Sequence, residues 1–241
     1  MKRLNVGNKI KTSGTGGFSF KGGTVKYFEE HIIKSIPFFL ESHKLISKLS
    51  TFFISENSNV YDFGCSTGLA SRSIVDGNLN KKFNLYGIDL SKDMIVKAKK
   101  LSNNNKYKKI KFMYGDVITK KIKKSDLIVS NYFIQFIPPK KRQLVFDKAF
   151  KSLNHGGGFI FFEKTRGPDA RFQDIFTQLY NEYKSDVGFS EKEILDKSKS
   201  IRGYLEPFTE KENFNFLKRA GFKDFVTVFK YYGFQGFLAI K

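Results

Sequence analysis

The chain has 241 residues, of which 40% are hydrophobic, and it carries a formal net charge of +20. This length supports one substantial core, and no run approaches the roughly 20 apolar residues that a membrane span needs. A single cysteine, Cys65, excludes an intrachain disulfide and a cysteine-rich metal site. The three histidines stand on separate elements without ligand spacing, so we expect no metal. Because the first residues lack the apolar core of a signal peptide, we expect a cytoplasmic protein.

The positive charge has two interpretations. A field of this sign attracts polyanions, which makes nucleic acid a candidate partner. Only seven of the 43 basic residues are arginine, however, and a composition rich in lysine, asparagine and phenylalanine also fits a genome of biased base composition. The charge therefore leaves both interpretations open and predicts no specific site.

The first 23 residues are rich in lysine and glycine, which predicts a flexible basic arm before one domain over residues 24–241. Two amphipathic helices are expected over residues 25–35 and 41–53, on either side of Pro37. Strands and helices then alternate: strands are expected at 60–63, 83–88, 110–114, 127–130 and 159–163, and helices at 69–75, 91–101 and 140–153. This alternation predicts a parallel sheet with helices on both faces.

Helical patterns follow the last of these strands. Residues 170–185 carry apolar side chains at helical spacing. Ser190 with Glu193, and Thr209 with Glu212, have the three-residue spacing of a capping box and so predict two further helix starts.

The end of the chain predicts a hairpin. Gly221 is placed to end the last helix, as a C-terminal glycine does. Residues 224–232 and 234–240 then form two expected strands joined at Gly233. The helical region before them, about residues 168–208, is expected to be a substrate cover and not a separate domain.

The most informative segment is the glycine loop after the first expected strand. It has the pattern D-x-G-x-x-x-G, formed by Asp62, Gly64 and Gly68, between a strand and a helix. A nicotinamide site requires G-x-G-x-x-G facing a pyrophosphate, and the carboxylate of Asp62 would repel that group. S-adenosylmethionine, which carries an ammonium and a sulfonium group in place of phosphates, suits this loop.

Three further positions lie at strand ends. Asp89 ends the second expected strand, where its carboxylate is placed to bind both ribose hydroxyls. Asp116 and Val117 follow the third, where a side chain and the next backbone amide can bind the adenine edge. Asn131 follows the fourth, beside the expected transfer position, but without the N-P-P-Y tetrapeptide typical of enzymes that methylate nucleobase amines.

Together these observations predict an α/β protein with the class I methyltransferase (Rossmann-like) fold. The expected sheet has seven mostly parallel strands and a C-terminal antiparallel hairpin, and the expected cofactor is S-adenosyl-L-methionine. The predicted cofactor-binding residues from this pattern are Asp62, Gly64, Cys65, Ser66, Gly68, Asp89, Leu90, Asp116, Val117 and Asn131.

From about residue 18 to residue 241 the sequence resembles the carboxy-S-adenosylmethionine synthase family. The segments that carry the resemblance include Gly64-Cys65-Ser66, Asn131 with Gln135-Phe136, Gly156-Gly157 before Glu163-Lys164, Gly188 to Ile194, and Lys218 to Phe222. The resemblance implies an enzyme that makes an ylide from S-adenosylmethionine, which traps carbon dioxide released from prephenate, in the pathway of wobble-uridine modification in bacterial tRNA. It also implies a homodimer.

The sequence departs from that family at two positions. A gap-free reading places Ser198 where the family has an arginine that holds the new carboxylate, and Ser lacks the bidentate fork of Arg. Lys197, Lys199 or Arg202 are candidates to replace it as point charges. A family tyrosine near the cofactor appears as Phe39.

These departures leave three interpretations. The first is a methyltransferase that acts on an unidentified, small acceptor, with Tyr132 as a candidate wall residue and no assigned general base. The alternative is a carboxy-S-adenosylmethionine synthase with an altered carboxylate clamp. The third is a non-catalytic RNA-binding protein, against which the three acids Asp62, Asp89 and Asp116 argue.

Overall fold

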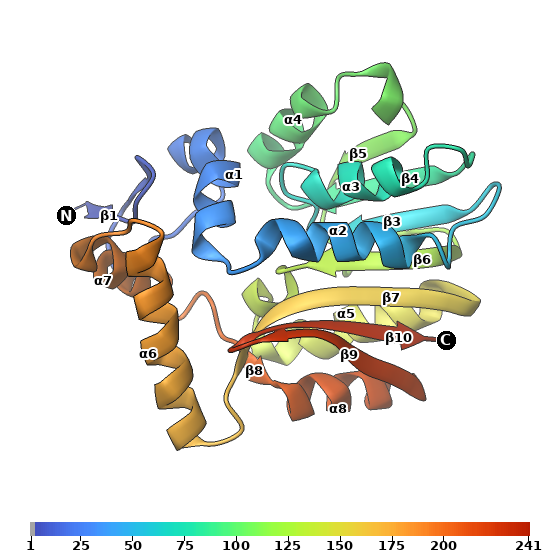
Figure 1. The fold of residues 1–241 in the computed structure, drawn as a ribbon. Helices are drawn as coiled ribbons and strands as arrows, with labels where there is room; N and C mark the ends of the chain where they lie inside the picture. The colour runs from blue at the N-terminus through green and yellow to red at the C-terminus, as the bar shows by residue number, and fades with distance from the viewer. Residues whose placement is uncertain (1–2) are drawn as a thin grey trace.

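The computed structural model describes residues 3–241 of the chain. A single large sheet lies at the centre of the molecule (Figure 1). The strand order is β5-β4-β3-β6-β7-β10-β9, with β8 pairing the end of β7. All neighbours from β5 to β7 are parallel, and β10 is antiparallel to both β7 and β9. The strands are β3 (Asn59–Phe63), β4 (Asn84–Asp89), β5 (Ile110–Tyr114), β6 (Ser125–Asn131), β7 (Leu153–Arg166), β8 (Phe208–Thr209), β9 (Asp224–Tyr231) and β10 (Phe234–Ile240).

Helices cover both faces of this sheet, as the alternation predicted. They are α1 (Gly23–Ser35), α2 (Phe39–Ser50), α3 (Leu69–Gly77), α4 (Lys92–Leu101), α5 (Pro139–Ser152), α6 (Ala170–Asp186), α7 (Glu191–Ser200) and α8 (Glu210–Ala220). The sheet order and the closing hairpin confirm the predicted class I methyltransferase fold.

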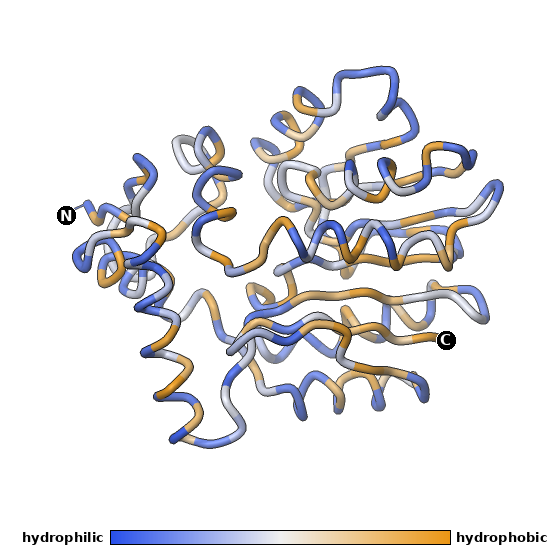
Figure 2. The backbone as a smooth tube through the Cα atoms, in the orientation of Figure 1, coloured by the Kyte–Doolittle hydropathy of each residue, from blue (hydrophilic) through white to orange (hydrophobic). Residues whose placement is uncertain are grey.

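Alternate side chains of the central strands enter two different cores, because successive residues of a strand point to opposite faces. Val60 and Leu127 pack in the core that contains Ile74 of α3. Their neighbours Tyr61 and Ile128 pack in the core on the other face, formed with residues of α5 and α8. Figure 2 shows the central strands as predominantly hydrophobic.

The predicted helix ends are confirmed. Both capping boxes are formed. The side chains of Ser190 and Thr209 each accept from the backbone amide of the glutamate three residues later, and the side chain of that glutamate accepts from the backbone amide of the serine or threonine. Gly221 ends α8 in the left-handed conformation, with φ 112°. These caps satisfy backbone groups that a helix end otherwise leaves unpaired.

The N-terminal segment differs from the prediction of an arm without regular structure. Its first two residues lie outside the described part of the chain. The strands β1 (Leu4–Asn5) and β2 (Lys11–Thr12) form a small hairpin. Val6 and Ile10 are each 1% exposed, and the Asn5 amide donates to the Asp196 carboxylate of α7 at 3.1 Å. The prediction was wrong because the hairpin buries Val6 and Ile10 and is hydrogen-bonded to α7 through Asn5, despite its glycine-rich sequence.

The cover helices lie beyond the carboxyl ends of the parallel strands. Figure 1 shows α6 and α7 there, with the N-terminal hairpin beside α7. The backbone amides of Gly16 and Phe18 donate to the carbonyls of Lys199 and Ser200, so the N-terminal segment is attached to the end of α7. In the part of the chain that the structure describes, no helix combines the length and the apolar character needed to cross a membrane.

Candidate functional site

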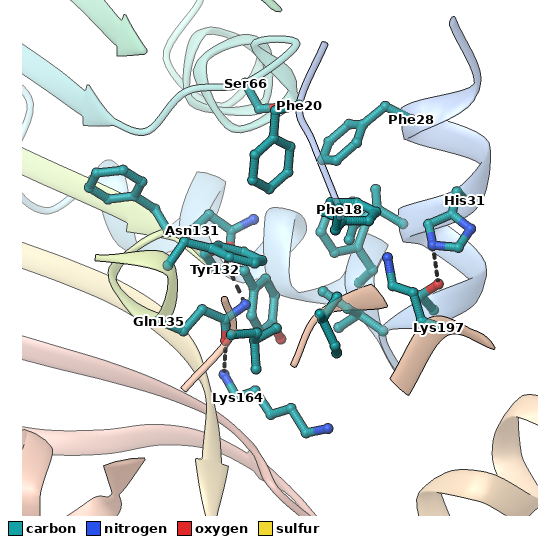
Figure 3. Close-up of a pocket in the computed structure, with 18 of the residues that line it drawn as sticks. Phe18, Phe20, Phe28, His31, Ser66, Asn131, Tyr132, Gln135, Lys164 and Lys197 are labelled. Carbon is teal, nitrogen blue, oxygen red and sulfur yellow. Dashed lines mark hydrogen bonds between the residues drawn. The ribbon is translucent and has the colours of Figure 1, made fainter. Parts of the chain in front are cut away.

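A cavity of about 1220 Å³ lies at the carboxyl ends of β3, β4, β6 and β7. The loops that follow these strands form its floor, α1 and the start of α2 form one side, and α6, α7 and the N-terminal segment close it. Figure 3 shows Asn131, Tyr132, Gln135 and Lys164 on one side, and His31 and Lys197 on the other. Ligands in α/β folds of this kind bind at this edge of the sheet.

The glycine loop is held in a conformation that other residues would not tolerate. Gly64 has φ 70°, and a Cβ there would lie 2.2 Å from the Phe133 ring. Gly68 has φ 80°, and its Cβ would lie 2.6 Å from the Phe112 ring. The amides of Gly64 and Cys65 both donate to the Ile88 carbonyl of β4. Both glycines are therefore required by the path of the loop.

Two of the predicted acids face the cavity from neighbouring strands. Asp62, which is 1% exposed, accepts a hydrogen bond from Ser71 Oγ at 2.6 Å, and burial raises the pKa of its carboxyl to about 6. Asp89 accepts from the amides of Ser66 and Ser91, each at 2.8 Å, and burial raises its pKa as well. Desolvation disfavours the charged form of each acid. A ligand group that is cationic or donates a hydrogen bond would stabilise that charged form.

The remaining predicted cofactor residues divide into two groups. Phe39, Cys65, Ser66, Leu90 and Asn131 line the cavity. Asp116 and Val117 lie outside its lining, as does Gly68. Asp116 Oδ1 accepts from the Ile118 amide at 2.8 Å, and Val117 is buried in the core. Contact of this pair with adenine stays a prediction.

A short hydrogen-bond chain fixes Asn131. His43 Nδ1 lies 2.7 Å from the Phe39 carbonyl oxygen, so that nitrogen must carry the proton. Its Nε2 then accepts from Asn131 Nδ2 at 3.1 Å. Burial lowers the pKa of His43 to about 4, which keeps the ring neutral. Asn131 Oδ1 is buried and has no hydrogen-bond partner among residues 3–241.

The loop after β6 is fixed by a buried glutamate. Glu163 accepts from the amides of Ile134 and Gln135 at 2.8 and 2.7 Å. Burial raises the pKa of Glu163 to about 8. Tyr132, in the same loop, has φ 53° and lines the cavity, and its buried hydroxyl lacks a hydrogen-bond partner in the described chain. A rigid loop of this kind positions Asn131 and Tyr132 together.

Besides Lys21 of the N-terminal segment, three lysines line the cavity, and of all four the sequence predicted only Lys197. Its Nζ lies 3.6 Å from the Phe18 ring centroid. The other two, Lys164 of β7 and Lys184 of α6, were missed. No carboxylate among the described residues lies within 4.0 Å of these ammonium groups. Burial lowers the pKa of Lys197 to about 7 and that of each of the other two to about 8.

Of the other predicted substrate residues near Lys197, only one lies in the cavity. Ser198 lines the cavity beside Lys197. Lys199 and Arg202 do not line it, and Arg202 is exposed to solvent. Of the candidates for a replaced arginine, therefore, only Lys197 reaches the cavity. No group of three or more histidine, cysteine or acidic side chains suited to a metal occurs in the described part of the chain.

The site thus has two regions of opposite character. The ends of β3 and β4 present Asp62 and Asp89. On the other side, β7, α6 and α7 present Lys164, Lys184 and Lys197, none of which has a carboxylate of the described chain within 4.0 Å, although Glu182 and Glu191 also line the cavity. Such an arrangement suits a ligand with a cationic or hydroxyl-rich part at one end and an anionic group at the other.

Comparison with known proteins finds relatives along nearly the whole chain. Residues 54–214 match the family model described as a methyltransferase domain. The chain is 37% identical over 218 residues to carboxy-S-adenosyl-L-methionine synthase from Staphylococcus epidermidis, which covers 90% of this chain and 94% of that protein. It is 34% identical over 224 residues to the synthase of the same name from Campylobacter lari, covering 93% and 94%.

Solved structures share the fold. An O-methyltransferase family protein from Burkholderia thailandensis matches with a TM-score of 0.67 and 13% identity, covering 92% of this chain and 61% of that one. Human N-acetylserotonin methyltransferase, solved in complex with S-adenosylmethionine, matches with a TM-score of 0.60 and 17% identity, covering 90% and 54%. At these identities the likeness is one of fold.

Proposed function

The chain belongs to the carboxy-S-adenosyl-L-methionine synthase family, and from this premise we propose that it converts S-adenosylmethionine to carboxy-S-adenosylmethionine. Prephenate is the proposed source of the added carboxyl group, as the resemblance to this family implies. This replaces methyl transfer to an unidentified acceptor as the first interpretation, because the relatives that match nearly the whole chain carry the synthase name.

The residues at the cofactor end fit S-adenosylmethionine. We propose that Asp62 receives the amino group of its methionine part and that Asp89, beside Leu90, receives the ribose hydroxyls. The bound molecule supplies an activated carbon attached to its sulfonium. The unpartnered oxygens of Asn131 and Tyr132 are polar groups that a ligand can pair with, as buried polar atoms require.

The observation that carries the proposal is the ammonium group of Lys197 in the same cavity. Lys197 and Ser198 both line it, and no carboxylate of the described chain lies within 4.0 Å of the Lys197 nitrogen. We propose that these two side chains hold the new carboxylate, Lys197 by charge and Ser198 by its hydroxyl. A simple methyl acceptor would not need an unpaired cation at this position.

Three wider expectations remain proposals. They are a role in tRNA wobble-uridine modification in the cytoplasm, a homodimer, and binding of nucleic acid by the positive surface. The tRNA role and the homodimer derive from the family resemblance, the cytoplasmic location from the composition of the first residues, and nucleic-acid binding from the net charge of +20.

The test is a reaction of the purified protein with S-adenosylmethionine and prephenate labelled with ¹³C in its carboxyl groups, followed by mass spectrometry. We expect a product heavier than S-adenosylmethionine by one labelled carbon dioxide, because the new carboxyl group replaces a hydrogen of the sulfonium methyl. Omission of prephenate is the control and must abolish the labelled product. Unchanged S-adenosylmethionine, or transfer of its methyl group to another molecule, would reject the proposal.

A further inference from the structure

Lys164 and Lys184 form a cationic pair in the cavity, and Lys197 lies near enough for the charge of Lys184 to act on it. Lys164 stands near the carboxyl end of β7, and Lys184 lies in the last turn of α6. The ammonium nitrogen of each lies 4.3 Å from the centroid of the Tyr180 ring. The two nitrogens therefore cannot be further apart than twice that distance. Tyr180 and Lys184 share one face of α6, because they are four residues apart.

Tyr180 is a fixed platform for the two lysines. Its hydroxyl donates to the Ser35 carbonyl at the end of α1 at 2.7 Å. Its ring packs edge-on against Phe234 of β10, with centroids 5.1 Å apart. Because the ring is held from two sides, the ammonium groups that lie against it share one defined region of the cavity.

No negative charge balances this pair. No acidic side chain of the described chain lies within 4.0 Å of either nitrogen. The charges that act on Lys164 are those of Lys184 and Arg166, both of the same sign. Lys184 is itself only 8% exposed. Two like charges that are partly removed from water destabilise the fold, and an anion between them would relieve this cost.

We propose that Lys164, Tyr180 and Lys184 form an anion subsite for the carboxylate that the donor retains. The inference rests on the proposed function. The donor is then a small dicarboxylate, of which one carboxylate binds at this lysine pair. The other leaves as carbon dioxide while the donor loses its ring hydroxyl as hydroxide, which takes a proton from the sulfonium methyl group; the resulting ylide carbon then bonds to the carbon dioxide near Lys197. The apolar middle of such a donor would contact the rings of Tyr180 and Phe234, which also line the cavity.

The test measures binding of prephenate by isothermal titration calorimetry to the full chain saturated with S-adenosylmethionine. We expect Lys164→Gln and Lys184→Gln each to weaken prephenate binding at least about tenfold, with the affinity for S-adenosylmethionine unchanged. Lys184→Arg should retain most of the affinity, because it keeps the charge. The control Lys34→Gln removes an exposed lysine of α1 outside the cavity lining and should bind as the wild type does.

Prephenate binding by both glutamine variants with wild-type affinity would overturn the subsite, as would an equal loss of affinity for S-adenosylmethionine. Misfolding is separated by thermal unfolding: removal of an unpaired, partly buried charge should leave the Tm of the glutamine variants at or above that of the wild type. A lower Tm for both would contradict the claim that these charges are uncompensated.

Failure of the proposed function would look different. If the wild type binds prephenate through the lysine pair but forms no labelled product, the subsite stands and the synthase proposal fails. If the wild type forms the product and the glutamine variants keep the KM for prephenate, the synthase proposal stands and the subsite fails.

Discussion

His43 orients the Asn131 side chain by accepting its amide proton over 3.1 Å, while its other ring nitrogen donates to the Phe39 carbonyl over 2.7 Å. The direction of both hydrogen bonds follows from the carbonyl, which can only accept. The amide of Asn131 therefore cannot rotate without loss of a buried hydrogen bond. Its Oδ1 is held in a buried position where no group of the described chain hydrogen-bonds to it.

The first prediction concerns this chain of hydrogen bonds. His43→Phe keeps an aromatic ring but leaves the Asn131 amide without its partner, whereas the Phe39 carbonyl still accepts from Ser42 Oγ at 2.7 Å. We expect a loss of about 1–3 kcal/mol in the free energy of unfolding, measured with urea, and at least a tenfold lower turnover. His155→Phe, at an exposed position, is the control. Wild-type turnover in His43→Phe would show that the orientation of Asn131 is unimportant.

His43 also predicts a pH dependence of stability. Its pKa is about 4 in the folded protein against 6.5 for an ordinary histidine, so the unfolded chain binds more protons between these values. The contribution of His43 to stability is therefore lost as the pH falls from about 6.5 to 4. Asp62, whose pKa is raised to about 6, acts in the opposite direction. The difference in unfolding free energy between wild type and His43→Phe should accordingly shrink from pH 7 to pH 4; a difference that stays constant would refute the neutral ring.

The second site prediction tests the glycine loop. Gly64→Ala places a Cβ 2.2 Å from the Phe133 ring at φ 70°. We expect a loss of more than about 2 kcal/mol in unfolding free energy and failure to bind S-adenosylmethionine in calorimetry. Gly156→Ala is a matched control, because Gly156 has φ 76° but no atom within 4 Å of its Cβ position. If both variants behave alike, the close approach of Phe133 is irrelevant.

Asp89 should determine the affinity for S-adenosylmethionine. Asp89→Asn replaces one of two oxygens that accept the amides of Ser66 and Ser91. The side-chain amide cannot accept both hydrogen bonds, so we expect at least about tenfold weaker binding by calorimetry. Asp76→Asn, which removes a half-exposed acid paired with Lys106, should bind normally. Equal affinities for the wild type and Asp89→Asn would remove Asp89 from the site.

Lys197 should link product binding to protonation. Its pKa of about 7 rises when an anion binds beside it, so binding of carboxy-S-adenosylmethionine at pH 8 should take up a proton. Calorimetry in buffers of different ionisation enthalpy measures this uptake, which should shrink in Lys197→Met. Lys199→Met should retain it, because Lys199 does not line the cavity. An undiminished uptake in Lys197→Met would assign the proton to another group.

The fold followed from the sequence because buried parallel strands are short apolar runs between helices. The strand expected at 110–114 is found with those bounds, and Ser190 and Thr209 cap helices as predicted. Asp62 and Asp89 were predictable because each lies at the carboxyl end of a parallel strand, and these ends meet at the edge of the sheet where ligands bind.

The cationic side of the cavity was not predictable in the same way. A lysine four residues after Tyr180 has the pattern of any solvent-exposed helix lysine, and only the packing of α6 over the sheet brings Lys184 near Lys164 of β7. The same holds for Phe18. Its ring lies against Lys197 because the N-terminal segment is hydrogen-bonded to the end of α7, which is far away in the sequence. Such tertiary contacts leave no local signal in the sequence.

The most direct measurement of the central claim is mass spectrometry of the small molecules released when the purified protein is denatured. We predict release of carboxy-S-adenosylmethionine, held by Asp62 and Asp89 at one end and by Lys197 at the other. Release of only S-adenosylmethionine or S-adenosylhomocysteine would contradict the synthase proposal, and a protein that neither carries nor takes up S-adenosylmethionine would contradict the assignment of the site itself.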